Sequence, residues 1–180
     1  MKTVQPIRDL KKIAEMKEML MKQHYRNYFL FVMGINTGLR ISDLLSLTVS
    51  DVKEKSHLIL NEKKTGKYKR FKINKELQDH IREYIQQLHE DDYLFKSLRG
   101  QQAIKRVQAW KILNKAAIEV GILEIGTHTL RKTFGYHFYQ KYKDIAILQE
   151  IFNHSSPSVT MRYIGINQDI IDEAVDGFSL

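Results

Sequence analysis

Apolar residues recur three or four positions apart along most of this chain, which is the spacing of amphipathic helices. The stretch 25–36 is apolar nearly all round, so we expect it at the centre of the core. The pattern predicts helices over residues 7–23, 25–36, 41–47, 75–89, 103–120, 127–142, 144–152 and 167–175, and one from Pro157 that carries Tyr163 near its end.

The spacing of apolar residues also predicts which side chains share one face of a helix. In the first helix we expect Ile7, Leu10, Ala14 and Leu20 or Met21 on the buried face. In the helix 103–120 the expected stripe is Ala103, Val107, Trp110, Ala117 and Val120. In the last helix Ile166, Ile170, Ala174 and Phe178 recur four residues apart and form a further apolar stripe.

Two short β-rich runs, 57–60 and 69–73, flank a polar turn at 63–67 and predict a β-hairpin. Asn74 follows the second run and can cap the next helix. The expected fold is therefore mainly α with one small β-hairpin, an α+β arrangement. A chain of 180 residues usually forms one domain.

Composition narrows the choice of partners. The hydrophobic fraction of 43% is enough for a real core, and the net charge of +8 favours an anionic partner, nucleic acid before a membrane surface. A basic protein with a solvated lysine-rich face would have the same charge.

The chain has no cysteine, which excludes disulfides and thiolate metal sites and fits a reducing compartment. The longest apolar run, 28–35, is far below the roughly 20 residues of a membrane helix, and the N-terminus lacks the apolar core of a signal peptide; we therefore expect a cytoplasmic protein.

The candidate chemistry gathers between Thr127 and Tyr163. His128 and Arg131 are three residues apart, so they are neighbours on one helical face. His154 follows in an Asn-His-Ser-Ser-Pro turn, and Tyr163 comes nine residues later. Such a set could supply donors for the oxygens of a phosphodiester and a hydroxyl to attack its phosphorus. Taken singly, each of these residues also has an ordinary structural reading, such as a turn histidine or a core tyrosine.

Two further cationic features precede that stretch. Arg40 opens a short helix after a glycine, and Asp43 one turn later could hold its guanidinium, although such pairs are usually surface pairs. Cations on the exposed face of the hairpin can lie against a phosphate backbone, or can simply keep the hairpin soluble. The candidates for DNA contact are Lys63, Lys67, Lys69 and Arg70, with Lys64 at the turn.

Taken together, these features resemble the catalytic set of the tyrosine recombinase (phage integrase) family. The matching stretches are TGLRISDLLSL, KKTGK, HTLRKTF and NHSSPSVTMRY, and the resemblance extends over nearly the whole chain. The matching residues are, in chain order, Arg40, Lys64, His128, Arg131, His154 and Tyr163. One departure is Phe152-Asn153 before His154, where family members commonly have Leu-Gly.

The resemblance implies a tyrosine recombinase catalytic-domain fold and a role for each residue. Tyr163 would attack a DNA phosphodiester to leave a 3′-phosphotyrosine and a free 5′-hydroxyl. Arg40 and Arg131 would clamp the non-bridging oxygens, because planar guanidinium forks match phosphate. Lys64 would protonate the leaving 5′-oxygen.

The remaining implied roles are supporting. His128 would assist proton transfer at the tyrosine, His154 would donate a hydrogen bond to the phosphate, and Asp43 would support the site. The chemistry implies no cofactor, and the sequence has no P-loop and no carboxylate cluster for ATP or Mg²⁺.

The resemblance also implies partners: double-stranded DNA, and other copies of the chain in a synaptic tetramer, contacted through the tail 164–180. Alternatively, that tail folds back on its own domain. We expect residues 1–180 to be a single catalytic domain without the N-terminal core-binding domain that the family usually carries. The expected function is site-specific recombination, as the integrase of a phage or mobile element. Rival readings are a type IB topoisomerase-like relaxase and a DNA-binding module with the fold but no activity alone.

Overall fold

The computed structural model describes residues 4–179, apart from the side chains of Gln168 and Ala174. Helices dominate this part of the chain, and two strands form an antiparallel hairpin. The elements are α1 (Leu10–Gln23), α2 (Tyr25–Thr37), α3 (Ile41–Leu44), the 3-10 helix η1 (Val49–Asp51), β1 (His57–Asn61), β2 (Tyr68–Lys72), α4 (Lys75–Ile85), α5 (Arg106–Glu119), α6 (Thr129–Tyr142), α7 (Ile145–Phe152), α8 (Pro157–Ile164) and α9 (Ile166–Asp176). The expected mainly helical fold with one small hairpin is confirmed.

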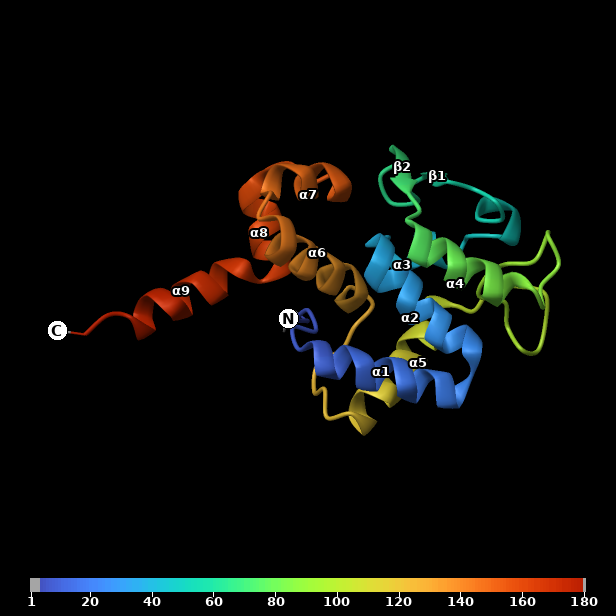
Figure 1. The fold of residues 1–180 in the computed structure, drawn as a ribbon, viewed down its shortest axis with the longest axis horizontal. Helices are drawn as coiled ribbons and strands as arrows, with labels where there is room; N and C mark the ends of the chain where they lie inside the picture. The colour runs from blue at the N-terminus through green and yellow to red at the C-terminus, as the bar shows by residue number, and fades with distance from the viewer. Residues whose placement is uncertain (1–3, 180) are drawn as a thin grey trace.

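Helix α2 is the centre of the main core, as its apolar sequence predicts. Five consecutive side chains, from Phe29 to Met33, are at most 1% exposed. Helices α1, α3, α4, α5 and α6 all contact it (Figure 1). The helix ends at Gly38, whose φ of +60° suits glycine, and a Cβ there would meet the ring of Phe134 on α6. The chain thus turns sharply into α3 just before Arg40.

Helices α6, α7 and α8 form a second, smaller cluster of buried side chains. Its buried apolar members are Leu148, Phe152, Ile164 and Ile166. Gly135 of α6 lets α8 approach closely, since a Cβ there would lie 2.7 Å from Ile164 and 2.8 Å from Phe152. Helix α6 therefore belongs to both parts of the molecule, and the residues at its start lie where the two parts meet (Figure 1).

Several local predictions are confirmed by the caps. The side chain of Asn74 accepts the amide of Leu77 at 2.8 Å, and that of Ser156 accepts the amide of Val159 at 3.3 Å. Pro157 occupies the first turn of α8, and Tyr163 is its penultimate residue. The predicted hairpin is also confirmed. Its two strands pair antiparallel, with His57 opposite Lys72 and Asn61 opposite Tyr68.

Two predicted helical faces are correct only in part: Ile7, Leu20, Ala117 and Val120 are buried as expected, but other members are not. In α1 the buried residues are Ile13, Met16 and Leu20, whereas Leu10 is 70% exposed. In α5 they are Ala109, Leu113, Ala116 and Ala117, whereas Val107 is 63% and Trp110 39% exposed. Both helices also begin three residues later than predicted. Small alanines on the inner side let α5 lie close to α1 and α2, which turns its larger Val107 and Trp110 away from the core.

Helix α9 extends away from the rest of the molecule toward the C-terminus (Figure 1). Its apolar residues Ile170, Ile171, Val175 and, just beyond the helix, Phe178 are 49–68% exposed. Ala174, expected on the same stripe, is one of the side chains that the structure does not describe. The start of the tail, with Ile164 and Ile166, is thus buried, whereas the apolar side chains from Ile170 onward do not pack on their own domain.

Candidate active site

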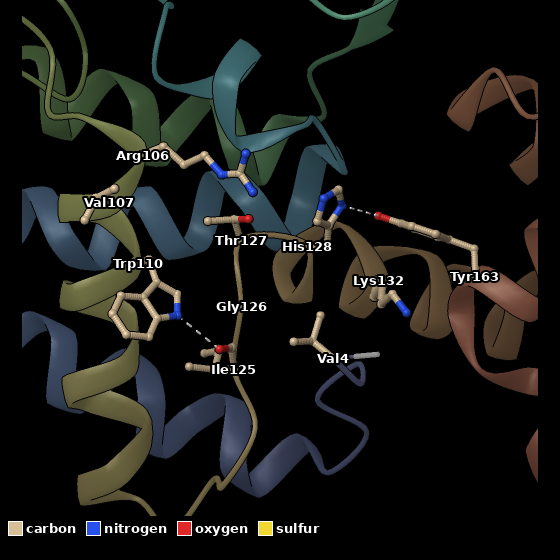
Figure 2. Close-up of a pocket in the computed structure, with 10 residues that line it drawn as sticks. All are labelled: Val4, Arg106, Val107, Trp110, Ile125, Gly126, Thr127, His128, Lys132 and Tyr163. Carbon is tan, nitrogen blue, oxygen red and sulfur yellow. Dashed lines mark hydrogen bonds between the residues drawn. The ribbon is translucent and has the colours of Figure 1, made fainter. Parts of the chain in front are cut away.

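The side chains of His128 and Tyr163 meet across the junction of α6 and α8. The tyrosine hydroxyl lies 3.2 Å from Nδ1 of His128, and the two rings are edge to face. Figure 2 shows them pointing toward one another from the start of α6 and the end of α8. Lys132, one turn along α6, places its Nζ 5.0 Å from the centre of the tyrosine ring. Residues 35 apart in sequence thus form one contact.

Arg131 is fixed from both sides by main-chain carbonyls. It is 2% exposed, and its two terminal nitrogens donate to the oxygens of Gly38 at 2.7 Å and Phe152 at 2.8 Å. Its guanidinium also lies 4.1 Å from the centre of the Phe152 ring. These two bonds connect the guanidinium to the ends of α2 and α7 and hold it rigidly. They use two of its five N–H donors and leave three for other partners.

Arg40 precedes α3 and pairs with an acid that the sequence pattern did not single out. Its NH1 lies 2.6 Å from Oε2 of Glu62, which is 1% exposed. Asp43, which we expected to hold the guanidinium, instead accepts the amide of Lys63 at 2.9 Å. Both acids thus connect the α3 region to the turn of the hairpin.

The hairpin presents most, but not all, of its cations to solvent. Lys63, Lys64, Lys67 and Arg70 are exposed. The expectation that Lys69 lies on the exposed face is wrong: it is 6% exposed, and its Nζ donates to the oxygen of Ile151 at 2.7 Å. The inward alternation of the second strand, with Lys69 two residues before Phe71, is the signal that could have predicted this.

His154 lies beside Tyr163, with ring centres 5.0 Å apart. Its Nδ1 lies 3.1 Å from the hydroxyl of Thr160 on α8. The preceding Asn153 has a φ of +54°, so it takes the left-handed conformation that glycine usually adopts. Asparagine tolerates that conformation, so the turn into His154 is made without glycine.

The electrostatics keep both histidines neutral. Desolvation, then the positive charges of Arg106, Arg131, Lys132 and Lys64, lower the pKa of His128. Burial and the charges of Arg131 and Arg40 lower the pKa of His154 to about 4. Burial raises the pKa of Tyr163, although Arg131 and Arg40 oppose that effect. The resting site is therefore a neutral phenol beside a neutral imidazole, within a cationic surround.

A groove of about 770 Å³ opens beside this pair (Figure 2). Val107, Trp110 and Ile125 line it on one side, with His128, Lys132 and Tyr163 on the other. Arg106 lies at its edge on α5. The outward turn of Val107 and Trp110, which the periodicity of α5 failed to predict, thus forms a wall next to the tyrosine.

The structure therefore brings together Arg40, Arg131, His128, His154 and Tyr163 around one point, while Lys64 stands in the exposed turn and its charge acts on His128. Among the described residues, no three His, Asp or Glu side chains are arranged to hold a metal ion. In the same part of the chain no helix is long and apolar enough to span a bilayer.

Known proteins resemble this chain in sequence over most of its length. The model of the phage integrase family matches residues 7–169. The probable integrase/recombinase YoeC of Bacillus subtilis is 57% identical over 169 residues, which cover 94% of this chain and 93% of YoeC. Tyrosine recombinase XerA of Pyrococcus furiosus is 29% identical over 93% of this chain, and the match spans 60% of XerA.

Solved structures share the fold at low sequence identity. The crystal structure of XerA recombinase superposes with a TM-score of 0.75 at 22% identity, covering 96% of this chain and 65% of that one. The catalytic domain of bacteriophage HP1 integrase gives 0.65 at 22% identity, covering 96% and 95%. A lambda integrase dimer bound to a COC′ core site gives 0.73 at 15% identity, covering 91% and 60%. The chain therefore belongs to the phage integrase family, together with relatives named as integrases and tyrosine recombinases.

Proposed function

We propose that this protein carries out site-specific DNA recombination by cutting and rejoining strands through a covalent 3′-phosphotyrosine at Tyr163. The observation that carries the proposal is the contact between the Tyr163 hydroxyl and His128. This contact places the nucleophile next to a proton acceptor, and two arginines held by protein groups lie beside it. Membership of the phage integrase family supports the same reaction.

In this proposal Arg40 and Arg131 bind the scissile phosphate. Each guanidinium is already anchored by protein groups, Arg131 by two carbonyls and Arg40 by Glu62. Donors that are fixed before the substrate arrives need no reorganisation when charge builds on the phosphorus. His154 adjoins the tyrosine and supplies a further contact to a phosphate oxygen.

The proposed reaction begins with the neutral tyrosine. A bound phosphodiester places its phosphorus in front of the Tyr163 oxygen, which forms a new P–O bond as the hydroxyl proton passes to Nδ1 of His128. The bond from phosphorus to the 5′-oxygen breaks, and Lys64 gives that oxygen a proton. The products are a 3′-phosphotyrosine and a 5′-hydroxyl.

Rejoining is the same step in reverse. A 5′-hydroxyl attacks the phosphotyrosine, Lys64 takes back a proton, and His128 returns one to the leaving Tyr163. If the attacking hydroxyl comes from a second duplex, strands are exchanged. Because the phosphodiester bond energy is kept in the covalent link, the cycle consumes no nucleotide.

Double-stranded DNA is the proposed substrate, and the protein is proposed to act in the cytoplasm as the integrase of a phage or mobile element. The net charge of +8 supports an anionic partner. Lys63, Lys67 and Arg70 are exposed on the hairpin that also carries Lys64, so they are proposed to contact the DNA backbone beside the cut site.

A second copy of the chain is the proposed partner of α9. This helix leads away from its own domain with Ile170, Ile171, Val175 and Phe178 exposed. Arg8 holds its first turn through a 3.0 Å ion pair with Asp169. An exposed apolar helix that projects from the body is suited to dock on a neighbour, and assembly into a tetramer on DNA is proposed to use this contact.

A nicked suicide duplex tests the proposal. Cleavage near the nick releases a short fragment, which prevents rejoining and traps the covalent product. Incubation with a random-sequence pool, followed by denaturing electrophoresis, should give a protease-sensitive shifted band. Binding at low salt without any such band would instead favour a DNA-binding module.

A further inference from the structure

A buried acid closes the hairpin at the turn that carries Lys64. Glu62 continues the inward face of β1, where Leu58 is also buried, and its own side chain is 1% exposed. Its backbone accepts the amide of Gly66 at 2.7 Å and donates to the oxygen of Lys67 at 2.9 Å. The side chain accepts the hydroxyl of Thr65 at 2.8 Å. Glu62 therefore holds both ends of the turn 62–67.

The same carboxylate reaches out of the hairpin to Arg40. Oε2, which accepts Thr65, lies 2.6 Å from NH1 of Arg40. One end of the guanidinium is thus held by Glu62, while the other donors of the fork can face a phosphate. Arg40 and the turn of Lys64 are consequently tied together by one side chain.

Lys69 is the buried counter-ion of this acid. Its Nζ lies 3.8 Å from Oε1 of Glu62 and donates to Ile151 at the end of α7. The next carbonyl, that of Phe152, accepts Arg131. The hairpin, Arg40 and the segment leading to His154 therefore share one network of buried contacts.

The charges in this network depend on one another. Burial raises the pKa of Glu62, but hydrogen bonds from Arg40 and Thr65 and the charges of Arg40 and Lys69 outweigh that effect and bring it below its usual value. Burial and Arg131 lower the pKa of Lys69 to about 8, so it stays mostly protonated at neutral pH. Removing one member of a buried pair leaves the other without a partner, and such a loss is strongly destabilising.

We propose that Glu62 is a positioning residue for DNA cleavage: by holding Arg40 and closing the 62–67 turn, it sets Lys64 at a fixed place relative to the phosphate clamp, with Lys69 as its counter-ion. This inference rests on the proposed function. Glu62 itself transfers no proton and touches no substrate. Its effect is geometric, and misplacement of a reacting group by about 1 Å can cost about 100-fold in rate.

Glu62→Gln tests the proposal, because it keeps the size of the side chain and removes its charge. The rate of covalent adduct formation is measured at saturating DNA on two suicide duplexes, one with an ordinary phosphate and one with a 5′-bridging phosphorothioate. The sulfur leaves without a proton, so it removes the need for Lys64. We expect a loss of about 100-fold on the phosphate and at most about 10-fold on the phosphorothioate. Equal losses on both substrates, or no loss, would overturn the proposal.

Three variants make the comparison specific. Lys64→Ala lacks the proposed proton donor, so it shows how far the phosphorothioate restores the rate of adduct formation when that donor is missing. Glu76→Gln, an exposed acid at the start of α4, should cleave both duplexes as the unmodified protein does. The double variant Glu62→Gln/Lys69→Met removes both buried charges, so it should regain thermal stability but not the rate on the phosphate. Recovery of the rate in the double variant would contradict a positioning role for Glu62.

A readout without DNA separates this inference from the proposed reaction. Amide hydrogen exchange of residues 62–67 should be at least 10-fold faster in Glu62→Gln than in Glu76→Gln. If neither the unmodified protein nor any variant forms an adduct, the proposed function fails. Hydrogen exchange then tests by itself whether Glu62 holds the turn 62–67. Unchanged exchange across the turn would refute the positioning role even in an active enzyme.

Discussion

The hydroxyl of Tyr163 and Nδ1 of His128 lie 3.2 Å apart, in contact before any DNA is bound. Because the pKa of His128 is lowered, the imidazole is neutral at neutral pH and can accept the tyrosine proton. Because burial raises the pKa of Tyr163, the phenol needs such an acceptor. The relationship gives each residue the protonation state that the proposed attack requires.

The pH dependence of cleavage should follow His128. The rate of adduct formation should be level near neutral pH and fall at acidic pH, below 6.5, as the imidazole gains a proton. His128→Ala should be slower by about 100-fold, in the range typical of general acid–base catalysis, and should lack this acidic limb. Single-turnover rates between about pH 5 and 8 measure both. An acidic limb that persists in His128→Ala would show that His128 is not the proton acceptor.

Arg131→Lys should lose both stability and activity, although the charge is kept. A single ammonium cannot bridge the carbonyls of Gly38 and Phe152 and still face a phosphate. One buried carbonyl left without a donor costs roughly 1–3 kcal/mol in the free energy of unfolding. Loss of a fixed donor to the phosphate costs on the order of 100- to 1000-fold in rate. Denaturant titration and the adduct assay check these figures, and an active, fully stable variant would contradict them.

His154 should make the folded protein sensitive to acid. Its pKa is about 4 in the folded chain against an ordinary 6.5, so between these values the unfolded chain binds more protons. The contribution of His154 to stability is therefore complete above pH 6.5 and is lost as the pH falls toward 4. Comparing unfolding curves at pH 7 and 5, His154→Gln should lose less stability than the unmodified protein. The exposed-histidine variant His89→Gln should behave as the unmodified protein does.

Charge on the tail should weaken assembly on DNA. Val175→Asp combined with Phe178→Asp places two carboxylates on side chains that are 65% and 68% exposed, so folding of the domain should be unaffected. We expect fewer complexes with more than one protein copy per duplex, as measured by analytical ultracentrifugation. Ser179→Asp adds one such charge beside the stripe and should assemble normally. Unimpaired assembly of the double variant would rule out docking through α9.

Local pattern predicted most elements of the fold because the deciding signals are local. The continuous apolar run of α2, the caps Asn74 and Ser156, and the turn of the hairpin each depend on a few neighbouring residues. The faces of α1 and α5 depend instead on which neighbours pack against them. In α5 the close contact is made by Ala109, Ala116 and Ala117, which weigh little in a hydrophobic pattern beside Val107 and Trp110.

Five of the six catalytic residues named from sequence come together, whereas Lys64 stands in the exposed turn. The groups that hold the five could not be predicted from the motifs. The carbonyls of Gly38 and Phe152 have no side-chain signature, and they fix Arg131. Glu62 and Lys69 do have a signature in the sequence, because each continues the inward alternation of its strand. A charged residue at a core position is the signal that would have identified the buried pair.

Locating the covalent bond between protein and DNA tests whether Tyr163 is the nucleophile. Trypsin cleavage after Arg162 yields the peptide 163–180, in which Tyr163 is the single tyrosine, and a missed cleavage there yields 144–180 with the same single tyrosine. Mass spectrometry of nuclease-trimmed adducts should find the nucleotide on this peptide, joined through its 3′-phosphate. Tyr163→Phe should form no adduct while binding DNA nearly normally, and Tyr142→Phe, an exposed tyrosine, should form it as before. An adduct on any other peptide, or one that persists in Tyr163→Phe, would contradict the account.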